Sequence, residues 1–368
     1  MISSKLRPMM TAALVLAFAT VSSQPGFAEE KLETKIGQML MMGFQGTSSR
    51  SAGAKRLASQ IKRGQVGGVV MLGYNFKSQA SVKGMTSLFK RSAGGRGILL
   101  AVDMEGGSVQ RLGRKLGYKS VSSAGSVAKR MSPDAAKAGF LQLAKISRSA
   151  GFNMNLAPVV DLLINPKNPV IGKWRRSYGR DPEKVTKYAR AFVQAHMETK
   201  VLPVLKHFPG HGSSRSDSHD GFVDISGSWQ KQELLPFKML IESGDAPAVM
   251  PGHLIHKGLA SDGVPVSISK AAITGVLRGR LNYQGLVVSD DLQMGAIAKN
   301  FGYKKTLILA INAGVDMLMI SNSRRPDPNL PGKTIAIIMD AVKTGQISPA
   351  TINAAYNRIV AAKAKVAW

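Results

Sequence analysis

The segment from Val201 to Asp220 reads VLPVLKHFPGHGSSRSDSHD, and it joins a short apolar run to a loop of titratable groups. Its first residues, Val201–Leu205, have the length and apolar character of a buried β-strand. Pro209 and Gly210 begin a Gly- and Ser-rich stretch that cannot continue as sheet or helix. The pattern predicts a buried strand with chemically active side chains on the loop at its carboxyl end.

Similar apolar runs recur along the chain and alternate with segments of helical character. Several runs lack the alternation of a half-exposed strand, as expected for strands covered on both faces. The predicted strands are Gln38–Phe44, Gly67–Leu72, Gly97–Val102, Asn153–Val159, Val201–Leu205, Pro247–Met250, Gly285–Val288 and Asp316–Ile320. The predicted helices are Ala52–Arg63, Ser78–Ser92, Ser132–Ser149, Asp181–Glu198, Gln232–Glu242, Lys270–Leu281, Lys304–Ala313, Lys333–Lys343 and Ser348–Lys365. This alternation predicts an α/β fold, a single-domain (β/α)8 TIM-type barrel, whereas fewer strands would favour an open doubly wound sheet.

Residues 1–28 have the features of a signal peptide. Lys5 and Arg7 precede the apolar stretch Met9–Val21, and Gly26-Phe27-Ala28 provides the small residues of a cleavage site. The apolar stretch is too short for a membrane span of about 20 residues, although an uncleaved N-terminal anchor is an alternative. We therefore expect an exported, periplasmic or extracellular protein that is not transmembrane, with a barrel domain over residues 29–368.

The composition narrows the classes of protein to which this chain can belong. The 368 residues contain no cysteine, which excludes disulfides, thiolate nucleophiles and cysteine metal sites. The formal net charge is +28, which favours electrostatic association with an anionic cell envelope. Nucleic acid is the less favoured partner, because the cations are scattered and no aromatic residues are interleaved with a basic block. We expect a monomer.

Polar clusters follow four of the predicted strands. In barrels of this type the loops after the strands meet at one face and carry the chemistry. The clusters are Asp103–Gly107 after strand three, Asp161 and Arg175–Tyr178 after strand four, Lys206–Asp220 after strand five and Ser289–Asp291 after strand seven. We expect these clusters to form one site.

Asp290 directly follows a predicted strand, so its carboxylate is expected at a fixed place at the barrel mouth. An ionised, fixed carboxylate can act as a nucleophile towards an electrophilic carbon. The alternative for such an aspartate is a helix N-cap. We expect the neighbouring Asp291 to be structural, as the cap of a helix that starts at Leu292.

Asp217-Ser218-His219 has the composition of a general acid/base unit. A carboxylate two residues before a histidine can hold its imidazole in one tautomer and shift its pKa. Metal binding by His207, His211 and His219 is the rival use, but Pro209-Gly210 prevents the helical geometry of a His-x3-His zinc site. We expect Phe208–Ser216 to be a mobile connector in which His211 is structural.

Further charged residues near the strand ends are candidate ligands for a polar substrate. Lys206, Arg111 and Arg176 can donate to hydroxyls, a carbonyl or an anionic group, and Asp103 can accept from sugar hydroxyls. Solvated surface charge is the alternative for any one of them.

The chain resembles glycoside hydrolase family 3, in its single-barrel β-N-acetylglucosaminidase branch. The strongest motif is Lys206-His207-Phe208-Pro209-Gly210-His211-Gly212 followed by Asp217-Ser218-His219. The supporting motifs are Ser289-Asp290-Asp291-Leu292-Gln293-Met294, Asp103-x-Glu105-Gly106-Gly107 with Arg111, Arg176-Ser177-Tyr178-Gly179 and Ala157-Pro158-Val159-Val160-Asp161. They occur in family order across nearly all of Glu29–Trp368.

The resemblance implies a retaining mechanism in which Asp290 attacks the anomeric carbon and His219, oriented by Asp217, is the acid/base. It also implies that five residues hold the ring of a terminal β-N-acetylglucosamine, as in peptidoglycan fragments or related glycans, without cofactor or metal. These five are Asp103, Arg111, Arg176, Lys206 and His207. Ser108 and Ser213-Ser214 depart from the family pattern, which leaves substrate preference and loop dynamics open. A β-N-acetylglucosaminide phosphorylase and a non-catalytic envelope glycan-binding protein are the alternative functions.

Overall fold

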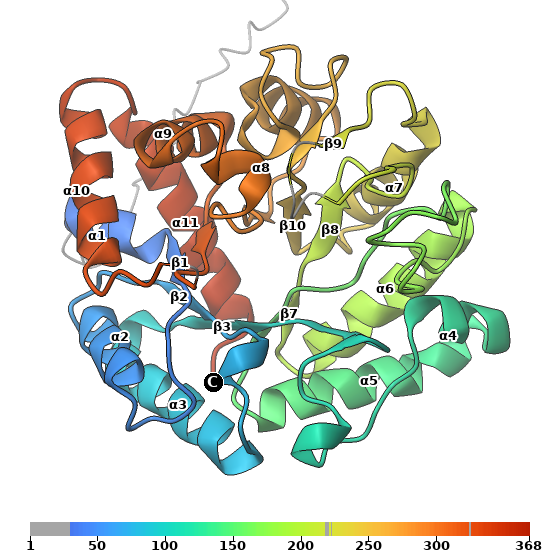
Figure 1. Cartoon of the computed structure of the whole chain (residues 1–368), viewed down its shortest axis with the longest axis horizontal. Helices are drawn as coiled ribbons and strands as arrows, with labels where there is room; N and C mark the ends of the chain where they lie inside the picture. Colours follow the sequence, from blue (N-terminus) through green and yellow to red (C-terminus); the bar gives the residue numbers. More distant parts are fainter. Residues whose placement is uncertain (1–29, 218–220, 222, 324) are drawn as a thin grey trace, which may run out of the picture. The chain divides into compact units, whose positions relative to one another are not determined.

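The computed structural model describes residues 30–217, 221, 223–323 and 325–368, so the predicted signal segment and His219 lie outside the described residues. Within this range, Leu32–Trp368 form a compact unit (Figure 1). In the described residues no helix has the length and apolar character needed to cross a membrane.

A parallel barrel forms the centre of this unit, and each predicted strand contributes to it. The strands are β1 (Leu40–Met42), β2 (Gly68–Val70), β3 (Leu99–Val102), β6 (Met154–Asn155), β7 (Leu202–Pro203), β8 (Leu205–Phe208), β10 (Ala248–Pro251), β12 (Leu286–Val287) and β13 (Leu318–Ile320). β7 and β8 are the two parts of the predicted strand Val201–Leu205, which extends three residues further than expected. The strand side chains are buried throughout, which explains the absence of period-two alternation.

The strand order closes the barrel. One sheet has the order β13-β1-β2-β3-β6-β7 and a second has the order β12-β10-β8. All of these pairings are parallel. The parallel bridges Val288↔Met317 and Val159↔Lys206 join the two sheets at both seams. The alternative of an open doubly wound sheet is therefore excluded.

Helices lie around the outside of the strands (Figure 1). They are α1 (Leu32–Gln38), α2 (Ala52–Lys62), α3 (Gln79–Ala93), α4 (Ala124–Arg130), α5 (Pro133–Ser149), α6 (Pro182–Glu198), α7 (Leu235–Glu242), the π-helix η6 (Ala271–Arg280), α8 (Gly295–Ala298), α9 (Tyr303–Ala313), α10 (Leu330–Lys343) and α11 (Pro349–Lys365). N-cap hydrogen bonds confirm the predicted starts of two helices, α5 and α6. Ser132 Oγ accepts from Ala135 N at 3.3 Å, and Asp181 Oδ1 accepts from Glu183 N at 2.9 Å.

Three local features differ from the sequence-based expectations. Gln38 ends α1 instead of beginning a strand, and its amide donates to Gly64 O at 3.0 Å. The antiparallel hairpin of β4 (Met104–Gly106) and β5 (Val109–Gln110) follows β3 directly. The short parallel pair β9 (Val223–Asp224) and β11 (Leu254–Ile255) lies outside the barrel sheets. These ladders are too short to leave a clear hydrophobic period in the sequence.

Candidate active site

A cavity of about 450 Å³ opens where the strands of the barrel end. Its lining residues come from the carboxyl ends of β2, β3, β6, β8, β10, β12 and β13 or from the loops that follow them. The sequence-predicted residues that line it are Asp103, Arg111, Arg176, Lys206, His207, Asp217 and Asp290. The barrel therefore brings together every predicted site residue that the structure describes.

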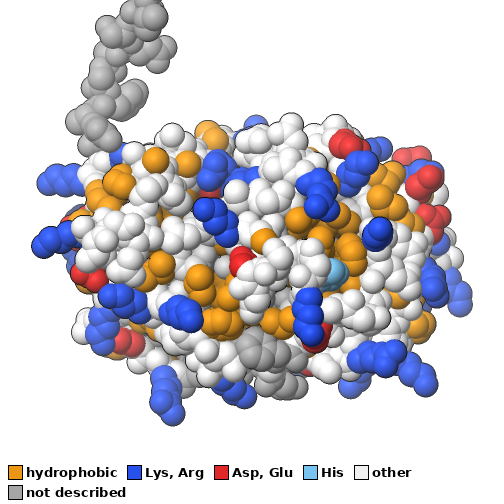
Figure 2. All heavy atoms as spheres, turned by 90° about the horizontal axis from the view of Figure 1, so that it is seen from above, with side chains coloured by type: hydrophobic (Ala, Val, Ile, Leu, Met, Phe, Trp, Pro, Cys, Tyr) orange, Lys and Arg blue, Asp and Glu red, His pale blue; other side chains and the backbone are white. Residues whose placement is uncertain are grey.

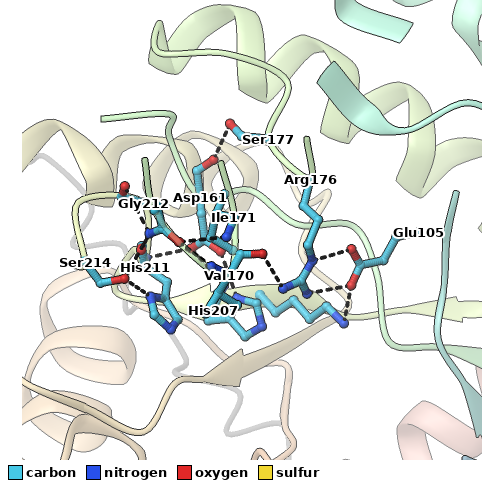
Figure 3. A network of polar contacts seen from close by, with 12 residues as sticks. Glu105, Asp161, Val170, Ile171, Arg176, Ser177, His207, His211, Gly212 and Ser214 are labelled. Atoms are coloured by element: carbon cyan, nitrogen blue, oxygen red, sulfur yellow. Dashed lines mark hydrogen bonds and ion pairs between the residues drawn. The ribbon is translucent and has the colours of Figure 1, made fainter. Parts of the chain in front are cut away.

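An ion network forms one side of the cavity (Figure 3). Arg176 donates to both carboxylate oxygens of Glu105, from Nε at 2.8 Å and from Nη2 at 2.7 Å. Lys206 Nζ lies 2.8 Å from Glu105 Oε1 and 3.1 Å from Asp103 Oδ1. Glu105 thus holds two cations in place, while Asp103 shares one of them and borders the cavity.

The opposite charges of this network stabilise one another's ionised forms. Burial on its own would raise the pKa of Glu105, but Arg176 and Lys206 outweigh burial and hold that pKa well below its usual range. Burial would likewise lower the pKa of Lys206, and the carboxylates of Glu105 and Asp103 raise it above its ordinary value. The lysine therefore stays an ammonium donor at neutral pH.

Arg111 is held more loosely. Its Nε lies 3.8 Å from Asp103 Oδ2, and its side chain is 38% exposed. Its backbone N donates to Asp103 O at 3.2 Å, which places the side chain beside the β4–β5 hairpin. Ser108 lines the cavity at the tip of the same hairpin.

Asp161 organises His207 of β8 and His211 of the loop after it. Its Oδ2 accepts from His207 Nδ1 at 2.8 Å, and its Oδ1 accepts from the backbone N atoms of His207 at 3.1 Å and His211 at 2.8 Å. Burial would raise the pKa of Asp161, but His207 and His211 lower it. Because Nδ1 of His207 donates to this carboxylate, Nε2 is the ring nitrogen that can serve a ligand in the cavity.

The loop from Pro209 to Ser214 is buried and firmly held, so the expectation of a mobile connector is wrong for this part. His211 Nδ1 and Ser214 Oγ are 2.7 Å apart, and Asn168 Nδ2 donates to His211 O at 2.8 Å and to Ser214 Oγ at 2.9 Å. Gly212 is packed so tightly that a Cβ there would lie 1.6 Å from Leu162 O.

His211 itself has a structural environment. Burial and the neighbouring His207 lower its pKa to about 4, so its ring is neutral at physiological pH. A neutral, buried imidazole bonded to a serine suits the structural role expected for it.

Glu233 anchors the same loop from the 3-10 turn Lys231–Leu234. Its Oε2 accepts from Ser213 N and its Oε1 from Gln230 N, both at 3.1 Å. Burial raises its pKa to about 7, and the nearby Asp161 adds to this rise. The side chain is fully buried, so this carboxyl titrates in the physiological range inside the protein.

Asp290 lies on a turn that β13 supports. Met319 N donates to Ser289 Oγ at 2.8 Å, and Asp291 N donates to Asp290 Oδ1 at 2.8 Å. Asp291 accepts through Oδ1 from Ser321 N at 3.0 Å and from Gln293 N at 3.1 Å. Asp291 therefore holds a turn, but it also lines the cavity. It does not cap a helix at Leu292, because α8 starts only at Gly295.

Within the described residues, no cluster of three or more His, Asp or Glu side chains is arranged to hold a metal ion. His207 and His211, two of the histidines considered for zinc, have their Nδ1 atoms hydrogen-bonded to Asp161 and Ser214, and the third, His219, lies outside the described residues.

Sequence reasoning gave no role to Glu105, Asp161, Asn168 or Glu233. Glu105 and Asp161 stand in clusters that the sequence does reveal, directly after strands three and four. Their partners lie 71 and 46 residues away, so only folding shows what they bind. The sequence around Asn168 and Glu233 contains no motif that would indicate their roles.

The fold and the cavity define a (β/α)8-barrel protein with an enzyme-type site at the carboxyl ends of its strands. The chain belongs to glycosyl hydrolase family 3, since the model of the family's N terminal domain matches residues 31–362.

Individual relatives agree with this assignment. A beta-hexosaminidase of Tolumonas auensis is 35% identical over 270 residues, which cover 72% of this chain and 78% of that protein. Beta-hexosaminidase A of Pseudoalteromonas piscicida is 30% identical over 364 residues, 90% of this chain and 60% of that protein. The structure of a glycoside hydrolase family 3 beta-N-acetylglucosaminidase from Paenibacillus sp. str. FPU-7 matches with a TM-score of 0.84 at 30% identity, over 92% of this chain and 63% of that one. The chain thus spans less than two thirds of two of these three proteins.

Proposed function

We propose that this protein is a retaining exo-β-N-acetylglucosaminidase that removes terminal N-acetylglucosamine from peptidoglycan fragments or related glycans. The observation that carries the proposal is that Asp290, from the loop after β12, and Asp217, from the loop after β8, line the same cavity as the Glu105 ion network. A volume of about 450 Å³ suits a small sugar unit. The names of the relatives support the same activity.

Binding of the terminal sugar follows from the donors and acceptors at the cavity wall. Asp103 can accept from sugar hydroxyls, while Lys206 and Arg176 donate from positions that Glu105 holds. His207 offers Nε2, because Asp161 takes Nδ1. These groups are fixed before the substrate arrives, which lowers the cost of ordering them.

Asp290 is the proposed nucleophile. One of its oxygens attacks the anomeric carbon as the bond to the leaving oxygen breaks, which gives a covalent glycosyl-enzyme. The Asp291 amide and the Ser289 anchor fix the carboxylate before reaction. Water then cleaves the glycosyl ester with a second inversion, so the product retains its configuration.

The proposed acid/base is His219, oriented by Asp217. His219 would protonate the leaving oxygen and later take a proton from the attacking water. The structure describes Asp217 at the cavity but not His219, so this role rests on the sequence motif. A histidine suits this position because a second carboxylate would oppose the ionisation of Asp290.

Product analysis with the purified protein tests the proposal. A chromogenic β-N-acetylglucosaminide and N,N′-diacetylchitobiose should release free N-acetylglucosamine, and added phosphate should not change the product. Formation of sugar 1-phosphate would instead establish the phosphorylase. Binding of the glycan without any product would establish the non-catalytic alternative.

Substitution of Asp290 tests its role as the nucleophile. Asp290→Asn should lower kcat by at least about 10³-fold, because the covalent step is lost. Asp340→Asn is the matched control, since this aspartate is exposed and pairs with Lys304. An unchanged rate in Asp290→Asn would remove Asp290 from the mechanism.

We also propose that the protein is exported and binds anionic envelope polymers. On the face shown in Figure 2, Lys and Arg side chains are spread over the surface without gathering in one patch. Together with a net charge of +28, this distribution favours non-specific electrostatic association. Pelleting with isolated cell envelopes should weaken as salt rises, and salt-independent pelleting would contradict the proposal.

A further inference from the structure

We propose that Trp174 is the stacking platform for the sugar on the leaving-group side of the cleaved bond, an inference that rests on the proposed glycosidase function. Trp174 belongs to the segment between β6 and α6, two residues before Arg176. It lines the cavity, yet 48% of its surface is exposed.

The exposure of Trp174 places it at the mouth of the cavity. By contrast, the apolar lining residues Val70, Leu156 and Met250 are between 1% and 3% exposed, so they belong to the interior. A large ring at the rim of a polar cavity leaves apolar surface in water that a ligand can cover. The terminal sugar occupies the interior, beside the ion network. A ring at the mouth therefore meets the next unit of the glycan.

The backbone around Trp174 is fixed in a tight turn. Arg175 N donates to Gly172 O at 3.0 Å, and Lys173 N donates to Asn168 O at 2.9 Å. Gly172 has no room for a side chain, because a Cβ would lie 2.3 Å from Pro166 O. The indole is thus presented by a rigid segment, so little entropy is lost when a ligand stacks on it.

Asn168 joins this turn to the loop that leads to Asp217. It is fully buried, and its Nδ2 donates to His211 O at 2.8 Å and to Ser214 Oγ at 2.9 Å, while its Oδ1 accepts from Ile171 N at 2.7 Å. The turn of Trp174 and the loop after β8 therefore form one continuous wall. The loop after β8 reaches Asp217, which lines the cavity and belongs to the proposed acid/base pair. Because the acid protonates the leaving oxygen, the leaving group lies along this wall.

The chemistry of a β-linked N-acetylglucosamine suits an indole ring. All of its substituents are equatorial, so each face of the sugar presents C–H groups that can cover an aromatic surface while the hydroxyls stay in water. A small alkyl leaving group has no such face. Trp174 should therefore affect reactions with a sugar leaving group and leave reactions with a small alkyl leaving group unaffected.

Two substrates separate these cases. With N,N′-diacetylchitobiose, Trp174→Ala should lower kcat/KM about tenfold, as expected for the loss of apolar contact, and Trp174→Phe should retain most of it. With a trifluoroethyl β-N-acetylglucosaminide, both variants should stay within about twofold of the wild type. Equal losses on the two substrates, or no loss on the disaccharide, would overturn the proposal.

Trp368→Ala is the matched control. Trp368 is also half-exposed, at 42%, but Lys90 and Arg148 lie 3.7 and 3.9 Å from its ring centroid, and it does not line the cavity. The cation over the ring of Trp174 is more distant, with Lys173 Nζ at 5.3 Å from the centroid. Trp368→Ala should leave kcat/KM unchanged on both substrates. A disaccharide-specific loss in Trp368→Ala as large as that in Trp174→Ala would also overturn the proposal.

A binding measurement separates failure of this inference from failure of the proposed function. Chitobiose and longer chito-oligosaccharides should change the tryptophan fluorescence of the Asp290→Asn protein, and Trp174→Phe in that background should abolish the change. If the wild type hydrolyses neither substrate but this change is seen, Trp174 binds glycan while the proposed activity fails. If no Trp174-dependent change is seen, the platform is refuted whether or not the protein is a hydrolase.

Discussion

Arg176 donates to both carboxylate oxygens of Glu105, at 2.8 and 2.7 Å, and this bidentate pair supports the sugar-facing side of the cavity. Lys206 joins the pair from β8 at 2.8 Å. Glu105 is thus the shared anion through which the segments after β3 and β6 meet β8. Its role is to position two cations that can then bind a ligand.

Glu105→Gln should destabilise the protein by about 3 kcal/mol, because it leaves two buried cations without their shared counter-charge. Denaturant unfolding at neutral pH measures this change. Glu242→Gln is the control, since its side chain is 58% exposed and lies 3.7 Å from Lys238. We expect almost no change there. Equal stability of the two variants would mean that the network contributes little to folding.

Glu233→Gln tests a pH effect on stability. Burial raises the folded-state pKa of Glu233 from 4.5 to about 7, so the folded protein binds this proton more tightly than the unfolded chain. The free energy of unfolding should therefore fall, by an amount on the order of 3 kcal/mol, as pH rises from about 4.5 to 7. The variant should lose this fall, whatever its absolute stability.

The exposed Glu198, which pairs with Lys137, provides the control for this titration. Glu198→Gln should retain the wild-type fall in stability with rising pH. If the free energies of unfolding of the wild type and Glu233→Gln changed in parallel with pH, the buried carboxyl would not titrate in this range.

Gly212→Ala tests the tight packing of the loop after β8. Its Cβ would lie 1.6 Å from Leu162 O, so the loop or its neighbour must move, at a cost of about 3 kcal/mol or more. Gly227→Ala meets nothing within 4 Å and should have little effect. Thermal or denaturant unfolding compares the two. A Gly212→Ala protein as stable as the wild type would show that this loop adapts easily.

His219→Ala tests the acid/base prediction through the leaving group. With a poor leaving group the loss in kcat/KM should be severe, about 10²-fold or more, since departure needs a proton. An activated phenolate leaves without protonation, so the glycosylation step should be much less affected. The kcat/KM values of an alkyl and an aryl glycoside, which report the glycosylation step without the later hydrolysis of the intermediate, measure this difference. The same loss on both would exclude His219 as the acid.

The elements of the barrel could be predicted because their signals are local. Ser132-Pro133 and Asp181-Pro182 mark helix starts that the structure confirms by their caps. Apolar runs such as Gly97–Val102 mark strands, although the strand itself is shorter, Leu99–Val102. The prediction also assigned Gln38 to a strand, whereas this residue ends a helix, and its side chain bonds to Gly64 and Lys363 far along the chain.

The sequence by itself determined the fold class, the order of the motifs and the strand ends or loops on which Asp103, Lys206, Asp217 and Asp290 stand. Periodicity, caps and glycines act over a few residues, so they are visible in the chain. Only the tertiary structure decided which side chains meet. Glu105 pairs with Arg176 across 71 residues, and Asn168 ties the Trp174 turn to a loop 43 to 46 residues later. Such contacts depend on barrel closure, because parallel strands align their carboxyl ends regardless of their separation in sequence.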